Sequence, residues 1–158
     1  MPYTTLWGNT NNTNFRIGIV VAKWNSFITD ELLEGALQTL KKKGVKDEQI
    51  IIAHCPGAYE IPFTASKLLP KVDGVITLGA VIHGDTPHFD YVCDAVNRGV
   101  TDLNIKGNKP VVFGVLTTDN VQQARERSGQ EGNKGNKGAE ASLALLEMLT
   151  LTKKIGQL

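Results

Sequence analysis

The stretch GVITLGAVIHGDTPH, residues 74–88, joins a continuous apolar run to a short polar turn. A short apolar run rich in β-branched residues is typical of a strand that is buried on both faces of a parallel sheet. Pro87 suits the first turn of a helix, where its missing N–H costs no hydrogen bond. We therefore predict a strand over Gly74–Ile82 and a helix that begins near Pro87 and runs to about Lys106.

The same alternation of strand and helix continues on both sides of this stretch. Further strands are predicted over Phe15–Ala22, Ile50–His54 and Pro110–Thr117. Four other helices are predicted. The first is capped by Asn25 or Ser26 and ends at Gly44, and the second is short and ends near Pro70. The third is capped by Thr118 or Asp119 and runs through Arg127, and the last follows the glycine-rich loop Ser128–Gly138. Alternating units of this size imply right-handed crossovers and helices on both faces of a parallel sheet. The predicted fold is a three-layer α/β/α sandwich with a four-stranded parallel, flavodoxin-like sheet.

The 158 residues have the length and composition of one domain. Residues 1–14 are polar but carry Tyr3, Leu6 and Trp7, so we predict an arm that docks on this subunit or on a neighbour. Residues 15–158 are predicted to form a single α/β domain.

Charge and composition exclude several classes of partner. The net charge of +1 gives no electrostatic footprint for nucleic acid or for an acidic membrane surface. The longest apolar stretch, Ile17–Ala22, is too short to span a bilayer. Met1–Asn14 has no apolar signal segment, and Cys55 and Cys93 form no paired motif, so we expect a cytoplasmic protein with reduced thiols.

Residues that follow the first two strands are candidates for ligand binding, because ligands of such sheets bind beyond the carboxyl ends of the strands. Trp24 follows the first strand and is either a core or hinge aromatic or a stacking surface for a planar heterocycle. No glycine-rich dinucleotide motif occurs there, which disfavours a Rossmann dehydrogenase. After the second strand, Gly57 allows close approach to the backbone. Glu60 either caps a short helix or accepts hydrogen bonds from ligand hydroxyls.

The third strand leads to His88 at a helix start, where free N–H groups and the helix dipole favour phosphate. A histidine has an ordinary pKa of about 6.5 and can transfer protons at neutral pH. Zinc-type side chains do occur, but without compact ligand spacing, so no metal site is predicted; they are His54, Cys55, His83, His88 and Cys93. The loop before the last helix lacks the spacing of a phosphate-binding P-loop, but Arg127 with Lys134 or Lys137 supplies cations for an anionic ligand.

Several ordered blocks of this sequence resemble the lumazine synthase family. They are PGAYEIP at residues 56–62, LGAVIHGDTPHFDYVC at residues 78–93, PVVFGVLT at residues 110–117, and Glu126–Arg127 before a Gly-Asn-Lys-Gly motif. The resemblance implies a transferase of riboflavin biosynthesis that needs no cofactor. Its reaction condenses 5-amino-6-(D-ribitylamino)uracil with 3,4-dihydroxy-2-butanone 4-phosphate. The products are 6,7-dimethyl-8-ribityllumazine, phosphate and water.

The resemblance also implies a role for each candidate residue. Trp24 stacks on the pyrimidine, and His88 transfers protons. The ribitylaminouracil is bound by Ala58, Tyr59, Glu60, Ala80, Val81 and Ile82, and the phosphate by Asp85, Thr86 and Arg127. Phe113 and Arg127 are given by an adjacent subunit. The duplicated Gly-Asn-Lys-Gly leaves open whether the site lysine is Lys134 or Lys137. We include Lys137 among the predicted site residues.

The implied assembly is a homopentamer, with a decamer or a sixty-subunit shell as alternatives and riboflavin synthase as a further partner. Trp24 stands where phenylalanine is more usual, and its larger face favours the hypothesis that the purified protein retains riboflavin. Two other classes share the predicted topology. They are a flavodoxin-like module that binds flavin or phosphate without turnover, and a structural shell protein with a vestigial site.

Overall fold

The sheet has four parallel strands in the order β2-β1-β3-β4, in a computed structural model that describes residues 2–132 and 134–158. The strands are β1 (Ile17–Ala22), β2 (Ile50–Cys55), β3 (Gly74–Ile82) and β4 (Val111–Thr118). The helices are α1 (Ser26–Lys42), α2 (Ile61–Leu68), α3 (His88–Lys106), α4 (Val121–Arg127) and α5 (Lys137–Gly156), with short turns of 3-10 helix at η1 (Asp47–Gln49), η2 (Ala58–Glu60) and η3 (Leu69–Lys71). The predicted fold class is confirmed.

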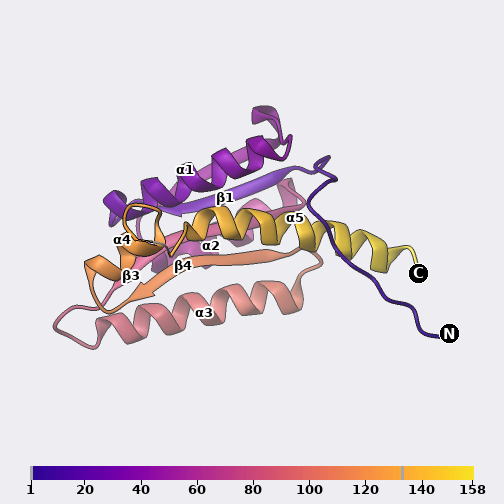
Figure 1. The fold of residues 1–158 in the computed structure, drawn as a ribbon. Helices are drawn as coiled ribbons and strands as arrows, with labels where there is room; N and C mark the ends of the chain where they lie inside the picture. The colour runs from indigo at the N-terminus through magenta and orange to yellow at the C-terminus, as the bar shows by residue number, and fades with distance from the viewer. Residues whose placement is uncertain (1, 133) are drawn as a thin grey trace.

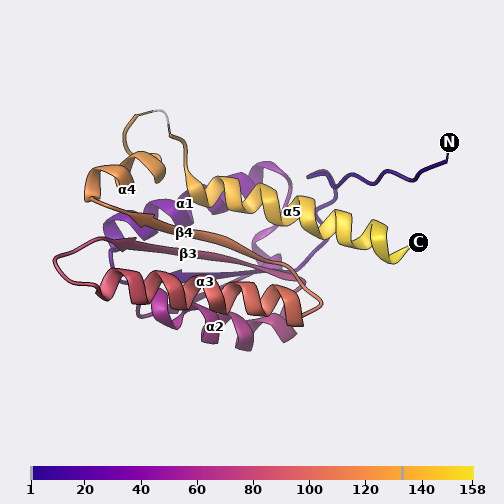
Figure 2. The same cartoon turned by 90° about the horizontal axis from the view of Figure 1, so that it is seen from below.

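Helices cover both faces of the sheet (Figure 1). Figure 2 shows α1 and α5 on one side and α2 and α3 on the other. Successive side chains of a strand point to opposite faces, and β1 feeds two separate cores accordingly. Ile19 and Val21 pack in the core beneath α1 and α5, whereas Val20 and Ala22 pack beneath α2 and α3. Burial on both faces explains why β1 has no polar side chain.

The carboxyl ends of the strands lie at one end of the molecule, together with α4 and the loop before α3 (Figure 1). Both chain termini lie at the opposite end in both views. Residues that follow the strands are therefore gathered far from the termini.

The start of α4 corrects one prediction. The predicted cap by Thr118 or Asp119 is wrong, because the N-cap is Asn120, whose side chain accepts a hydrogen bond from the Gln123 N–H at 2.8 Å. Thr118 is still the last residue of β4, and its hydroxyl donates to the Asn120 carbonyl at 2.9 Å. Thr118 pairs with Ile82 of β3 as a strand residue, and the helix begins only at Val121.

The N-terminal arm contacts its own subunit along α5. The Thr150 hydroxyl accepts from the Asn9 N–H and donates to the Asn9 carbonyl, both at 2.8 Å. Lys154 Nζ donates to the Trp7 carbonyl at 2.7 Å. Tyr3, nearer the start of the arm, is 88% exposed.

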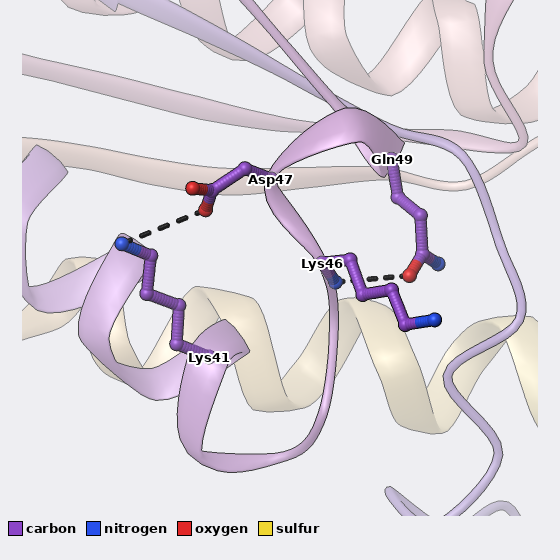
Figure 3. Close-up of polar contacts among 4 residues, drawn as sticks. All are labelled: Lys41, Lys46, Asp47 and Gln49. Carbon is purple, nitrogen blue, oxygen red and sulfur yellow. Dashed lines mark hydrogen bonds and ion pairs between the residues drawn. The ribbon is translucent and has the colours of Figure 1, made fainter.

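Gln49 ties the arm to the connection between α1 and β2 (Figure 3). Its side-chain oxygen accepts the Lys46 N–H at 2.9 Å, and Lys41 pairs with Asp47 at 3.5 Å beside it. The Gln49 amide donates to the Thr13 carbonyl at 2.6 Å. These contacts fix the point at which the arm enters β1.

Within residues 2–132 and 134–158, every helix is too short or too polar to cross a bilayer.

Candidate functional site

A cavity of about 380 Å³, the strand-end cavity, opens at the carboxyl ends of β1 and β3. Its size lies within the range of about 300–1,000 Å³ that is usual for small-molecule sites. The residues that line it are Trp24, Asn25, Ala58, Tyr59, Glu60, Ala80, Val81, Ile82, His88 and Val92. All of them except Asn25 and Val92 belong to the predicted site.

The turn after β1 presents Trp24 at this cavity. The Lys23 and Trp24 N–H groups donate to the Cys55 and Pro56 carbonyls at 2.8 and 2.9 Å, so the backbone of the turn is paired with the segment after β2. The Trp24 side chain is 65% exposed. The alternative of a buried core aromatic is therefore wrong, and the ring has an open surface at the carboxyl end of the sheet. A role as a hinge or as a stacking surface stays a prediction.

Asn25 is the N-cap residue of α1, but its side chain does not cap the helix. The amide donates instead to the Ala80 carbonyl at 2.8 Å. β1 pairs with β3 only as far as Val21 and Leu78, so Ala80 lies past the end of this ladder. The Asn25 amide thus gives the Ala80 carbonyl a hydrogen-bond donor where no residue of β1 is paired with it. No local sequence signal reports a difference in ladder length, which is why this contact was not predicted.

Glu60 ends the 3-10 turn η2 and accepts the Gly57 N–H on Oε1 at 2.9 Å. This bond closes the η2 turn, but the Glu60 side chain makes no cap hydrogen bond to α2, of which Glu60 is the N-cap residue. A carboxylate has about four acceptor sites on its two oxygens, so one N–H uses part of its capacity. Binding of ligand hydroxyls by Glu60 stays a prediction.

His88 is the first residue of α3, and its side chain is exposed at the cavity. The His88 N–H donates to the Thr86 hydroxyl at 3.4 Å. Asp85 and Thr86 lie in the exposed turn before the helix, outside the residues that line the strand-end cavity. The structure therefore brings His88 together with the aromatic and carboxylate candidates, and it places the two predicted phosphate residues just beyond them.

A second cavity of about 400 Å³, the β4 cavity, holds the remaining candidates. It is lined by Phe113, Val115, Leu116, Thr117, Thr118, Arg127, Lys134, Lys137 and Glu140. Arg127 is partly buried, and its Nη1 donates to the Gln123 carbonyl at 3.1 Å. Both alternative lysines reach this cavity, so either one is placed to meet an anion.

Glu140 was not predicted at this place. It follows Lys137 by three positions on α5, and residues at that spacing share a helix face. The sequence therefore carried a signal for it. Among the described residues, the lining sets of the two cavities have no member in common.

The two cysteines, Cys55 and Cys93, are free thiols. Burial raises the pKa of the Cys55 thiol, and the charge of Glu60 raises it further. Burial also raises the pKa of the Cys93 thiol, with Asp90 adding to the shift. Both groups stay protonated at neutral pH, and a protonated thiol is a poor nucleophile. In the described part of the chain, no group of three or more His, Cys, Asp or Glu side chains is arranged to hold a metal ion.

Together these features define a flavodoxin-like α/β protein with a cavity of small-molecule size at the carboxyl ends of its strands. A family model described as 6,7-dimethyl-8-ribityllumazine synthase matches residues 14–153. The 6,7-dimethyl-8-ribityllumazine synthase of Phocaeicola vulgatus is 49% identical over 121 residues, which cover 75% of this chain and 72% of that protein. The enzyme of the same name from Parabacteroides distasonis is 51% identical over 119 residues, 74% of each chain. The chain belongs to the 6,7-dimethyl-8-ribityllumazine synthase family, as the resemblance of its sequence blocks predicted.

Proposed function

We propose that this chain condenses 5-amino-6-(D-ribitylamino)uracil with 3,4-dihydroxy-2-butanone 4-phosphate to give 6,7-dimethyl-8-ribityllumazine, phosphate and water. This is the penultimate step of riboflavin biosynthesis. Family membership supports the reaction. The observation that carries it at the site is that Trp24, Glu60 and His88 line one cavity, since the three supply an aromatic surface, a carboxylate and a proton carrier.

The chemistry requires repeated proton transfer. The amine of the uracil attacks the ketone, water leaves as the imine forms, phosphate is eliminated, and the second amine closes the ring with loss of another water. His88 is the proton carrier at the strand-end cavity, and general acid–base catalysis of this kind contributes about 10²–10⁴-fold. Holding the two substrates together supplies much of the remaining acceleration.

The proposal gives each substrate a position at the site. Trp24 stacks on the pyrimidine ring, and the backbone of Ala58–Tyr59 and of Ala80–Ile82 binds its polar edge. Glu60 accepts from the ribityl hydroxyls. Asp85, Thr86 and the N-terminus of α3 receive the phosphate, because free N–H groups and the helix dipole favour an anion there.

We further propose that two subunits complete each site. Phe113, Arg127 and Lys137 line the separate β4 cavity, and in this proposal they serve the strand-end cavity of a neighbour, with Lys134 as the alternative lysine. Cations placed in this way would neutralise the departing phosphate. A homopentamer is the proposed assembly, and a decamer or a shell remains the alternative for sedimentation to decide.

The arm and the cellular setting are part of the same proposal. Residues 1–14 would act as an arm that contacts a neighbour, which the exposure of Tyr3 and Trp7 supports, and residues 15–158 would form the catalytic domain. The free thiols favour a reducing, cytoplasmic location. Riboflavin synthase, which consumes the product, is the proposed protein partner.

The test is direct. The protein is mixed with both substrates, and the fluorescent lumazine and released phosphate are followed together. We expect both to form in equal amounts. No product above the spontaneous background would reject the enzyme and leave a binding module or a shell protein.

A further inference from the structure

Trp24 rests on the backbone of Gly57. A Cβ built on Gly57 would overlap Trp24 Cε3 and would lie 2.7 Å from Cζ3 and 3.2 Å from Cδ2. Gly57 itself is buried, and its φ of −134° is extended backbone that any residue adopts. Glycine is therefore required here by the space that the indole occupies, and not by the backbone conformation.

The turn that carries Trp24 is held from both sides of β1. Toward β2, its backbone donates to the Cys55 and Pro56 carbonyls. Toward β3, the Asn25 amide donates to the Ala80 carbonyl at 2.8 Å. Asn25 adopts a left-handed backbone with φ of 62°, the one non-glycine residue with positive φ in the described ranges 2–132 and 134–158. Asparagine tolerates this conformation better than most residues.

Gly57 is fixed in turn by Glu60, whose Oε1 accepts the Gly57 N–H at 2.9 Å. The side chain of Trp24 packs on this fixed glycine and is still 65% exposed. The indole thus has one part in contact with protein and a large part open at the cavity before any ligand arrives.

We propose that Gly57 and Asn25 are positioning residues, which hold Trp24 as a preformed stacking surface for the planar ring of the uracil substrate. This inference rests on the proposed function. A ring that is already ordered does not lose its side-chain freedom when the substrate binds, and that loss weakens affinity by about three- to tenfold for one side chain. The butanone phosphate has no planar ring, so its binding does not depend on Trp24 in this way.

Another explanation for Gly57 predicts different behaviour. Glycine at the end of a strand also permits a ligand to approach the backbone closely. In that case a methyl group at residue 57 would obstruct the substrate itself, whether or not Trp24 is present. An experiment can separate the two explanations, because only in the first does the effect of a methyl group at residue 57 depend on the indole of Trp24.

The experiment begins with Gly57→Ala in the full chain. Its backbone suits alanine, and the exposed indole can move into solvent, so we expect a folded protein. The expected change is a KM for the ribitylaminouracil raised about tenfold, with the KM for the butanone phosphate unchanged. Equal changes in both KM values, or no change in either, would overturn the proposal.

A double-mutant cycle supplies the matched control. In a Trp24→Ala background, Gly57→Ala is expected to have no further effect, because the side chain that it displaces is gone. A further rise of the ribitylaminouracil KM in that background would show that Gly57 faces the substrate directly, and positioning of Trp24 would then be rejected.

A measurement without substrate separates this inference from the proposed function. The chain has two tryptophans, so a Trp7→Phe background leaves Trp24 as the one source of tryptophan emission. Gly57→Ala, and Asn25→Gly as the second variant, are expected to lower the fluorescence anisotropy of Trp24 and to increase its quenching by acrylamide. Asn25→Gly keeps the left-handed backbone and removes only the amide. Unchanged anisotropy in both variants refutes the positioning role, whether or not the parent protein makes lumazine.

Discussion

Asn136 is expected to be one of the most costly polar side chains to remove. It lies between the loop that carries Lys134 and the start of α5, and each end of its amide is used. Oδ1 accepts the Gly138 and Ala139 N–H groups at 2.8 and 3.1 Å, and Nδ2 donates to the Glu31 and Ser128 carbonyls, both at 3.0 Å. The side chain therefore caps α5 and also joins it to α1 and to the end of α4.

The expected cost of Asn136→Ala follows from these contacts. Loss of an N-cap costs about 1 kcal/mol. Each of the two bonds made by Nδ2 adds about 0.5–1.5 kcal/mol. The free energy of unfolding should thus fall by about 2–4 kcal/mol. For a chain of this size, that corresponds to a decrease in Tm of roughly 5–15 °C.

Asn136→Ser is the matched control. Serine keeps a side-chain acceptor at the N-cap, and it lacks the amide group that donates to the Glu31 and Ser128 carbonyls. Urea unfolding at one fixed protein concentration should therefore place Asn136→Ser between the parent and Asn136→Ala. A loss below about 1 kcal/mol for Asn136→Ala, or an equal loss for both variants, would refute this account of the amide.

Four further outcomes are expected. His88→Ala should lower kcat about 10²–10⁴-fold without abolishing turnover, and complete loss of activity in a folded, substrate-binding variant would contradict a large contribution from proximity. His88→Ala and Arg127→Ala proteins, each with lowered activity, should gain activity when they are refolded together if each site uses two subunits, whereas separate refolding should give no gain. Riboflavin should quench the emission of Trp24. A colourless protein that shows no quenching on titration with riboflavin would contradict the hypothesis that the purified protein retains riboflavin. Because burial raises the pKa of both Cys55 and Cys93, their reaction with a disulfide reagent should be slow at neutral pH and should reach half of its maximal rate only above the ordinary thiol pKa of 9.0. Fast labelling at pH 7 would contradict the raised pKa values.

Much of the strand-end cavity was predictable because its residues follow strands in the sequence. The bounds of β3 were predicted at Gly74–Ile82, since a continuous apolar run between polar residues leaves little freedom for its ends. Parallel strands bring their carboxyl ends together, so Trp24, Glu60 and His88 meet although they are far apart in the chain.

The failures of prediction were contacts that depend on distant pairing. Thr118, Asp119 and Asn120 are all acceptable caps by residue type, and residue type alone does not show that the ladder between β3 and β4 extends to Thr118 or that Asn120 is the cap. The Asn25 amide finds the Ala80 carbonyl only because β1 is shorter than β3. The secondary-structure propensities of neighbouring residues indicate neither the choice of cap nor the difference in strand length.

The separation of the termini from the strand carboxyl ends has a practical use. The last turn of α5 points away from the cavities, and Leu158 is 82% exposed. A peptide tag, a dye or a link to a sensor surface joined at this residue would leave the mouth of the strand-end cavity of its own chain open to solution. Attachment through the C-terminus thus gives every immobilised copy the same orientation, which is what surface-based measurement of ligand binding requires.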